Sequence, residues 1–390
     1  MHSMPHADES SLSVAFNDIP DPRCSASVRY PLPAILALTM SALLAGQQSV
    51  LAIAEWGARQ PTDILTRLGF VAGQTPCQST FQRVFAKLDS DAIARVLTEH
   101  FASPSPPDGP SGISLDGKAF RGWLGYANDG CPVHLLTAVC HASGMALAHE
   151  PIEADGVSKA EAELTVAPAL IDQLNWPGHV LTGDALFCQR ALCQQVRAAG
   201  GDYLLLVKGN QPRLHADLML LFDPPADSGA LPLTDQPTAH TIECGHGRQQ
   251  EVRHLVATTD LTDYLDWPDV AQVFRLERTW REHGVSKRQL HYGITSLETA
   301  VGTPERLLAL KRGHRGIENR LHRVKDVTFG EDASLIHTGQ GPFVMALLRD
   351  TAISLLYRSG IRQVAACLRR HSQHPEAALD LVLLSPPTHA

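Results

Sequence analysis

The clearest candidate for chemistry is Glu318, a single carboxylate inside a strongly basic stretch of the chain. Between Pro304 and Lys325 the sequence holds seven Lys or Arg and two Glu, although the whole chain has a net charge of -8. Read as a helix, this stretch has one face with polar residues at intervals of three and four: Lys311, His314, Glu318, His322 and Lys325. A charge run by itself is equally well explained as the solvated face of a basic helix.

Two upstream aspartates, Asp116 and Asp184, could join Glu318. Each follows an apolar run that we expect to be a strand, and Gly117 or Gly183 stands beside each acid. An acid at the end of a strand, next to a residue that permits close approach, is a usual position for a metal ligand. The competing structural interpretation is that Asp116 caps a turn and Asp184 caps the helix that follows it.

Three carboxylates in one cleft repel one another unless cations lie between them. Two Mg²⁺ ions about 3.5 to 4 Å apart would satisfy them and would support an in-line phosphodiester displacement. The basic side chains near Glu318 would then hold the phosphates around the scissile bond. Lys118 and Arg121, shortly after Asp116, are either further phosphate contacts or exposed strand residues.

The expected order of elements in the middle of the chain is three strands, a helix, a strand, a helix and a strand. This is the order of a ribonuclease-H-like fold, so the predicted class is α/β, with an antiparallel meander extended by crossover units. In that core the first and fourth strands are neighbours, which would bring Asp116 and Asp184 together. The predicted divisions are a disordered lead (1–15), a helical N-terminal domain (16–102), a Pro-rich linker (103–112), the catalytic domain (113–340) with a β-rich insertion (about 223–300), and C-terminal helices (341–390).

The segment after Pro76 is predicted to be an amphipathic helix in the N-terminal region. Thr75 followed by Pro76 is typical of a helix start. One face would carry Phe81, Val84, Phe85 and Leu88, and leave Gln78, Gln82, Arg83 and Lys87 on the others. This helix could be the recognition helix of a helix-turn-helix, or a plain packing helix in a small bundle.

Composition narrows the function classes further. The chain is 44% hydrophobic and 19% charged, as in globular proteins. Its eight cysteines include no C-x-x-C pair and its histidines no zinc-binding pattern, so neither a zinc site nor a small-molecule cofactor is expected. The longest apolar run, from Ala34 to Gly46, is shorter than the roughly 20 residues of a membrane span. We therefore expect a cytoplasmic protein without a membrane partner.

Several ordered motifs resemble one family, the H-repeat-associated, ISAs-type transposases of bacterial insertion sequences, within the DDE transposases. They run over roughly residues 18 to 384 and include Leu115–Gly122, Leu181–Gln189, Tyr203–Pro212, His246–Arg248 and His314–Asp332. The N-terminal segments around Tyr30, Trp56 and Phe81 are similar to the small domain that precedes the catalytic core in this family.

The resemblance implies that Asp116, Asp184 and Glu318 form the DDE triad and bind two Mg²⁺ ions, with Mn²⁺ as a substitute. It implies cleavage of double-stranded DNA at the element ends, strand transfer into target DNA, and a homodimer during synapsis. In this interpretation the phosphate contacts are Lys325, His314, Lys311, Lys118, Arg121 and Arg315.

This chain departs from the family pattern at two positions of the basic stretch. Arg315 and Arg323 stand where tryptophan is common, and each replaces a large apolar side chain by a charged one. The helix would then either bind more DNA phosphates, or belong to a copy of the transposase with impaired catalytic activity. Two alternatives to a transposase therefore stay open: a DNA-binding relic, and a nuclease of the same fold that does not join strands.

Overall fold

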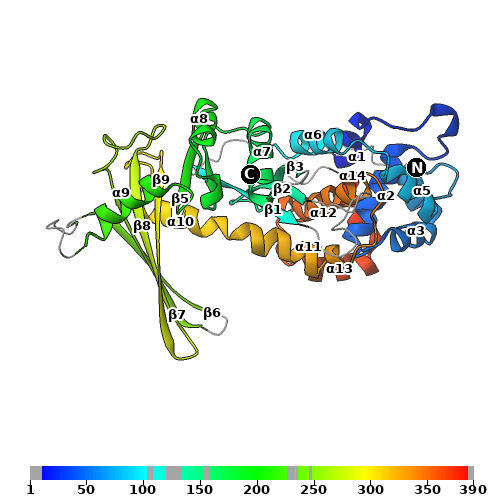
Figure 1. Ribbon diagram of the computed structural model, residues 1–390. Helices are drawn as coiled ribbons and strands as arrows, with labels where there is room; N and C mark the ends of the chain where they lie inside the picture. The colour runs from blue at the N-terminus through cyan, green and yellow to red at the C-terminus, as the bar shows by residue number, and fades with distance from the viewer. Residues whose placement is uncertain are drawn as a thin grey trace. The chain divides into compact units, whose positions relative to one another are not determined.

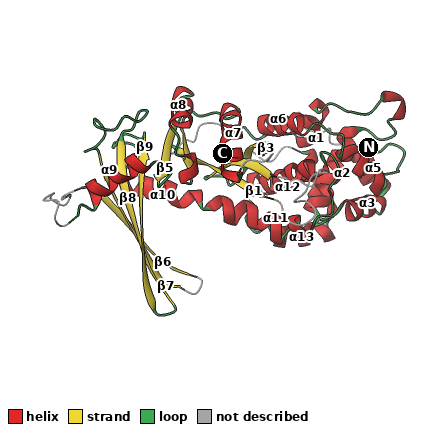
Figure 2. Cartoon of the chain, viewed as in Figure 1, coloured by secondary structure: helices red, strands yellow, loops and turns green. Residues whose placement is uncertain are grey.

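The computed structural model describes residues 11–102, 109–119, 134–152, 158–225, 233, 236–245 and 248–384 of the chain. Arg121 and the motif residues His246 and Gly247 lie outside the described residues. Figure 1 gives the course of the chain, and Figure 2 separates its helical and strand segments.

The N-terminal part of the chain is helical, as predicted. Its helices are α1 (Leu12–Ala15), α2 (Leu32–Leu44), α3 (Val50–Ala58), α4 (Thr62–Arg67), α5 (Gln78–Phe85) and α6 (Ser90–His100). The predicted disordered lead of residues 1–15 needs correction, because α1 lies inside it. Leu12 is fully buried in the core and therefore orders this segment.

The strands hydrogen-bond in the order β3-β2-β1-β4-β5-β9-β8-β7-β6. The first five are β1 (Ser111–Ala119), β2 (His134–Cys140), β3 (Ala146–Ile152), β4 (His179–Gly183) and β5 (Asp202–Val207). β2 and β3 are antiparallel, whereas β1, β4 and β5 are parallel. The order 3-2-1-4-5 is the predicted ribonuclease-H-like arrangement, so the α/β fold class is confirmed.

Four antiparallel strands continue the sheet beyond β5. They are β6 (Thr238–Gly245), β7 (Arg248–Thr258), β8 (Gln272–Glu282) and β9 (Val285–Thr295), and β9 pairs with β5. All four strands lie within the residues that the sequence predicts to be a β-rich insertion, about 223–300. Figure 1 shows the long antiparallel ribbon that these strands form. The predicted β-rich insertion is therefore part of the main sheet.

Two of the remaining described helices have a side-chain cap at their start. Ser158 and Glu161 form a reciprocal capping box at the start of α7 (Lys159–Asp172), and Thr303 caps α10 (Pro304–His314). The others are α8 (Arg190–Ala198), α9 (Pro212–Phe222), α11 (Arg323–Val327), α12 (Gly341–Arg358), α13 (Val364–Gln373) and α14 (Pro375–Leu383).

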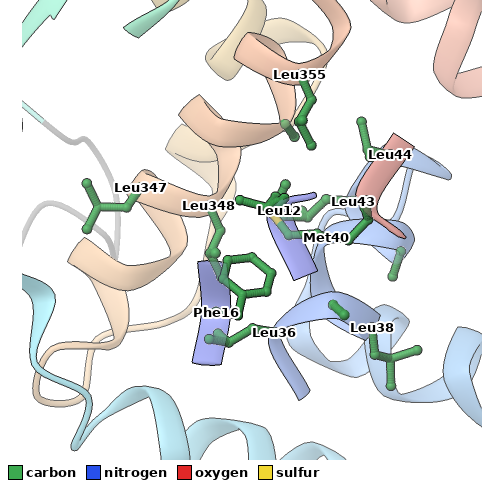
Figure 3. Packing of buried hydrophobic residues seen from close by; sticks show 14 of the residues in the cluster. Leu12, Phe16, Leu36, Leu38, Met40, Leu43, Leu44, Leu347, Leu348 and Leu355 are labelled. Atoms are coloured by element: carbon green, nitrogen blue, oxygen red, sulfur yellow. The ribbon is translucent and has the colours of Figure 1, made fainter. Parts of the chain in front are cut away.

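The chain forms two compact units, and they differ from the predicted domains. One contains residues 1–102, 117–174 and 317–390, and the other contains 103–116 and 175–316. The predicted N-terminal domain and the C-terminal helices share the first unit because they bury one common core. Figure 3 shows that core, where Leu12, Phe16 and Met40 pack with Leu348 and Leu355 of α12.

Within the residues that the structure describes, no helix is both long enough and apolar enough to span a membrane.

Candidate active site

Asp116 and Asp184 belong to the same compact unit and occupy neighbouring strands. β1 and β4 pair in parallel with a constant offset of 68, from Ser111 opposite His179 to Ser114 opposite Thr182. The ladder ends with this last pair, and the same offset continued for two residues predicts that Asp116 lies beside Asp184. Adjacent strands lie about 4.8 Å apart, so the two backbone positions are close.

The immediate surroundings of the two acids differ. Asp116 is half-buried and lies within β1, which runs on to Ala119, so the prediction that the strand ends at Asp116 needs correction. Asp184 is exposed and directly follows β4. The hydroxyls of Ser114 and Thr182, 3.1 Å apart, join the two strands just before the acids.

Asp184 also caps the helical turn that follows it, which is the alternative role that the sequence suggested. Its Oδ1 accepts a hydrogen bond of 2.9 Å from the backbone N–H of Leu186 and caps the short 3₁₀ turn that follows. One lone pair of a carboxylate is used in this way, and a carboxylate offers about four. The cap therefore orients Asp184 and leaves it able to bind a cation.

The glycine beside Asp116 has a packing role. A Cβ atom at Gly117 would collide with the carboxylate of Glu163, and the Lys159 ammonium donates to the carbonyl of Gly117 at 2.9 Å. The glycine thus permits the close approach of α7 to β1.

Basic side chains gather near Asp184 in the same unit. Burial, together with Arg315 and Lys208, lowers the pKa of the Lys311 ammonium to about 8, and Asp184 opposes this shift. Burial and the charges of Lys311, Lys208 and Arg315 lower the pKa of His291 to about 4. The imidazole of His291 is therefore uncharged at neutral pH, and we call Lys208, Lys311 and Arg315, together with this neutral ring, the cationic cluster.

The sheet register explains two members of this cluster. β5 and β9 are antiparallel with Val207 opposite Tyr292, so the next pair along is Lys208 and His291. Neither residue is among the site residues that the sequence motifs predict. Lys208 stands directly after an apolar strand, at the carboxyl end where α/β sheets bind ligands, and this signal could have identified it.

His314 has a hydrogen-bonding role within this unit. Its Nδ1 lies 3.2 Å from the Ser114 hydroxyl and so connects α10 to β1 beside Asp116. This hydrogen bond uses one of the two ring nitrogens, and the predicted phosphate contact by His314 stays a prediction.

Glu318 belongs to the other compact unit, where it is exposed and begins a π-helical turn, Glu318–His322, that leads into α11. The predicted continuous α-helix is therefore interrupted. A π turn has i to i+5 bonding, which breaks the intervals of three and four on which the shared face depended.

Lys118 and Lys325 are buried, which corrects their prediction as phosphate contacts. Lys325 is 1% exposed, and its Nζ lies 2.9 Å from Asp350 Oδ1 and 3.5 Å from Glu331 Oε1. Lys118 is 9% exposed and pairs with Glu331 at 2.9 Å and with Asp326. Burying a cation is costly unless it is paired, and the buried acids provide those partners.

These residues form a buried ion network within one unit, which also includes His149 and Arg349. His149 Nε2 lies 3.1 Å from Asp350 Oδ2, and Arg349 lies 3.7 Å from Glu331 Oε1. Burial alone would raise the pKa of Asp350, but Lys325 and His149 lower it to about 2. The basic helix is therefore anchored in the core by Lys325.

His322 gives this region a dependence on pH. Burial, with the nearby charges of Lys325 and Lys118, lowers the pKa of its imidazole to about 3. An unfolded histidine binds a proton near pH 6.5, so the stability contributed by neutral His322 is present above pH 6.5 and is lost between 6.5 and 3. We expect the wild type to lose on the order of 1 to 2 kcal/mol between pH 6.5 and 5 through this group.

Urea denaturation at several pH values measures this effect, with His322→Asn as the test and the exposed His374→Asn as the matched control. The asparagine variant at 322 should lack this part of the pH dependence. Equal pH profiles for His322→Asn and the wild type would contradict the assignment.

The sequence motifs imply a bound metal ion. The side chains near Asp116 and Asp184 can be compared with the ligands that such an ion prefers. Among the residues that the structure describes, no group of three or more His, Cys, Asp or Glu is placed to hold a metal. The neighbouring carboxylates Asp116 and Asp184 nevertheless fit Mg²⁺, which usually takes one or two carboxylates together with waters and substrate phosphates.

Comparison with known proteins agrees with the resemblance seen in the sequence. The family model described as "Transposase DDE domain" matches residues 107–356, and a model described as "DDE_Tnp_1-associated" matches residues 14–101. A relative from Escherichia coli O157:H7 named "Putative transposase YncI" is 29% identical over 347 residues, covering 87% of this chain and 85% of the relative. The "H repeat-associated putative transposase YhhI" of Escherichia coli K12 is 27% identical, covering 88% of this chain and 91% of the relative.

Among solved structures, the piggyBac transposase synaptic complex with hairpin DNA has a TM-score of 0.43 and 11% sequence identity, covering 98% of this chain and 80% of that one. The family prediction is confirmed by the sequence matches. The chain belongs to the transposase DDE domain family.

Proposed function

We propose that this transposase cleaves DNA at the ends of an insertion sequence and transfers the freed strand into target DNA in a Mg²⁺-dependent reaction. The observation that supports the proposal is the register of β1 and β4, because Ser114 lies opposite Thr182 and the segments that carry Asp116 and Asp184 follow directly, with Asp184 at the carboxyl end of β4. Ligands of open α/β sheets bind at that edge.

In the proposal Asp116, Asp184 and Glu318 hold the metal ions, which supply Lewis-acid stabilisation of the attacking and leaving oxygens when bound. Glu318 enters through its sequence motif, and its exposed position at the start of a π turn leaves the carboxylate accessible. The hydrogen bond that Asp184 accepts from Leu186 N–H would keep its carboxylate oriented when a substrate binds.

The cationic cluster neutralises the DNA backbone in this proposal. Lys208, Lys311 and Arg315 form charge-assisted hydrogen bonds to phosphate oxygens, which position the scissile strand without reading its sequence. Arg315 is exposed, so the arginine at a usual tryptophan position adds to the basic surface. Element ends and target are double-stranded DNA, and a dimer of the protein would hold two ends together.

A strand-transfer assay tests the proposal. A labelled duplex from the end of the surrounding insertion sequence is incubated with a supercoiled plasmid, Mg²⁺ and the protein. We expect both nicked duplex and joined product. Nicking without joining would indicate a nuclease, and binding without either product would indicate a DNA-binding relic.

Glu318→Ala tests the third carboxylate in the same assay. Removal of a metal-binding carboxylate costs several kcal/mol of transition-state stabilisation, so we expect cleavage to fall about 10³-fold or more. The fold should be unaffected because Glu318 is exposed. The exposed Glu376→Ala is the matched control, and undiminished cleavage by Glu318→Ala would remove Glu318 from the site.

A further inference from the structure

A cavity of about 580 Å³ lies beside α5 in the N-terminal region, within a single compact unit. Its lining contains four basic side chains (Arg23, Arg29, Arg83 and Lys87) and no acidic one. We call it the basic pocket. None of these residues belongs to the proposed catalytic site.

Three of the four cations keep their charge available. Arg23 is neutralised, since it forms a bidentate pair with Asp21 at 2.8 and 2.7 Å. Across the part of the chain that the structure describes, no ion pair involves Arg29, Arg83 or Lys87. Three uncompensated positive charges around one cavity create a field that favours a polyanion.

The hydrogen bonds of the two arginines orient them without neutralising them. Arg83 Nε donates to the carbonyl of Ser79 at 3.1 Å, and another of its nitrogens lies 3.3 Å from the Thr80 hydroxyl. Arg29 donates to the amide oxygen of Gln74 and lies over the ring of Tyr30, 5.5 Å from its centroid. Neutral acceptors thus fix each guanidinium and leave its charge for a ligand.

The exposed face of α5 suits duplex DNA in particular. Phe81, Val84 and Phe85 are buried, as the sequence predicts, which turns Ser79, Gln82 and Arg83 outward. Amide, hydroxyl and guanidinium groups are those that bind base edges in the major groove, which is wide enough for a helix. The connection from α4 to α5 covers residues 68–77, longer than the three or four residues of a helix-turn-helix, so α5 is not in that motif.

We propose that the basic pocket binds the phosphate backbone of duplex DNA and places the outward face of α5 against the base edges. The basic pocket would hold the element end, and its residues are far in sequence from the carboxylates of the proposed catalytic site. The inference rests on the proposed function only in that DNA is the ligand, and its test needs no cleavage.

The main test is the affinity of the full chain for a fluorescein-labelled 30-base-pair duplex, measured by anisotropy in EDTA over a range of KCl concentrations. The variant is Arg83→Ala with Lys87→Ala, and the matched control is the exposed Arg95→Ala on α6. Each lost phosphate contact lowers the salt slope by about 1, so we expect the double variant to lose about 2 and to bind about 10-fold or more weakly. A slope and affinity equal to those of Arg95→Ala would overturn the inference.

Cys77 provides a second measurement on the unmodified protein. It lines the basic pocket, and hydrogen bonds with the Ser79 and Thr80 hydroxyls, each 3.4 Å from its Sγ, lower the pKa of this exposed thiol to about 6. Iodoacetamide should therefore alkylate Cys77 rapidly at neutral pH. Bound duplex should slow this reaction several-fold while leaving Cys367 unchanged, and an unaltered rate at Cys77 would also count against the inference.

The two proposals fail in different ways. The catalytic proposal is scored by the cleavage rate of Asp184→Asn, and the basic pocket by the duplex affinity of Arg83→Ala with Lys87→Ala in EDTA. If the double variant binds normally while Asp184→Asn no longer cleaves, the basic pocket is refuted and the catalytic proposal stands. If the double variant binds weakly while Asp184→Asn still cleaves, the catalytic assignment is refuted and the basic pocket stands.

Discussion

Replacing Asp350 by alanine is expected to destabilise the folded protein by about 3 to 5 kcal/mol. Asp350 is fully buried on α12 and lies 2.9 Å from Lys325, which is itself 1% exposed. The variant would leave the Lys325 ammonium buried without its closest carboxylate, and His149 would lose its hydrogen bond. Urea denaturation, followed by circular dichroism, measures the loss.

Asp380→Ala is the matched control for this experiment. Asp380 lies in the same unit and pairs with Arg67 at 2.6 Å, but the two side chains are 49% and 26% exposed. Surface ion pairs contribute about 0 to 1 kcal/mol, so this variant should remain close to the wild type. If both variants lost the same small amount of stability, the buried ion network would not anchor the basic helix.

Replacing Asp184 by asparagine is expected to lower the rate of DNA cleavage by about 10³-fold or more, equivalent to about 4 kcal/mol. Asparagine retains a side-chain oxygen that can accept the hydrogen bond from Leu186 N–H, so the cap persists while the charge is lost. The substitution therefore separates metal binding from the structural role. Single-turnover cleavage of an end duplex in Mg²⁺ measures the effect.

Asp263→Asn removes an exposed carboxylate of the same unit and serves as the control. Thermal melting of both variants checks that the fold is unchanged. Cleavage by Asp184→Asn within a few-fold of the control would show that the carboxylate is a cap alone.

Much of the local structure follows from patterns in the sequence. The buried face of α5 and the alternation of strands and helices follow from hydrophobic periodicity, because each element must cover an apolar surface. The closeness of Asp116 and Asp184 was also predictable, since the element order implies that the first and fourth strands are neighbours. Hydrophobic periodicity did not reveal the short helix at Leu12 within the predicted disordered lead, because one helical turn has too few residues to show a pattern.

Hydrophobic periodicity could not predict which basic residues are buried and which are exposed. Lys325 and Arg315 are both cations of one basic stretch, yet one is buried against Asp350 and the other is exposed. The acid that pairs with Lys325 lies 25 residues further along the chain, and the π turn shifts the helical face between them. Lys208 and His291 come together only through the pairing of β5 with β9.

The sequence by itself determined the family and the fold class, because these depend on residue types at fixed spacing along the chain, and its motifs predict the three carboxylates of the proposed site. Only the tertiary structure decided which cations face solvent and which stabilise the core. The cost of burying a charge depends on partners that are distant in the chain, and those partners are known only after the chain has folded.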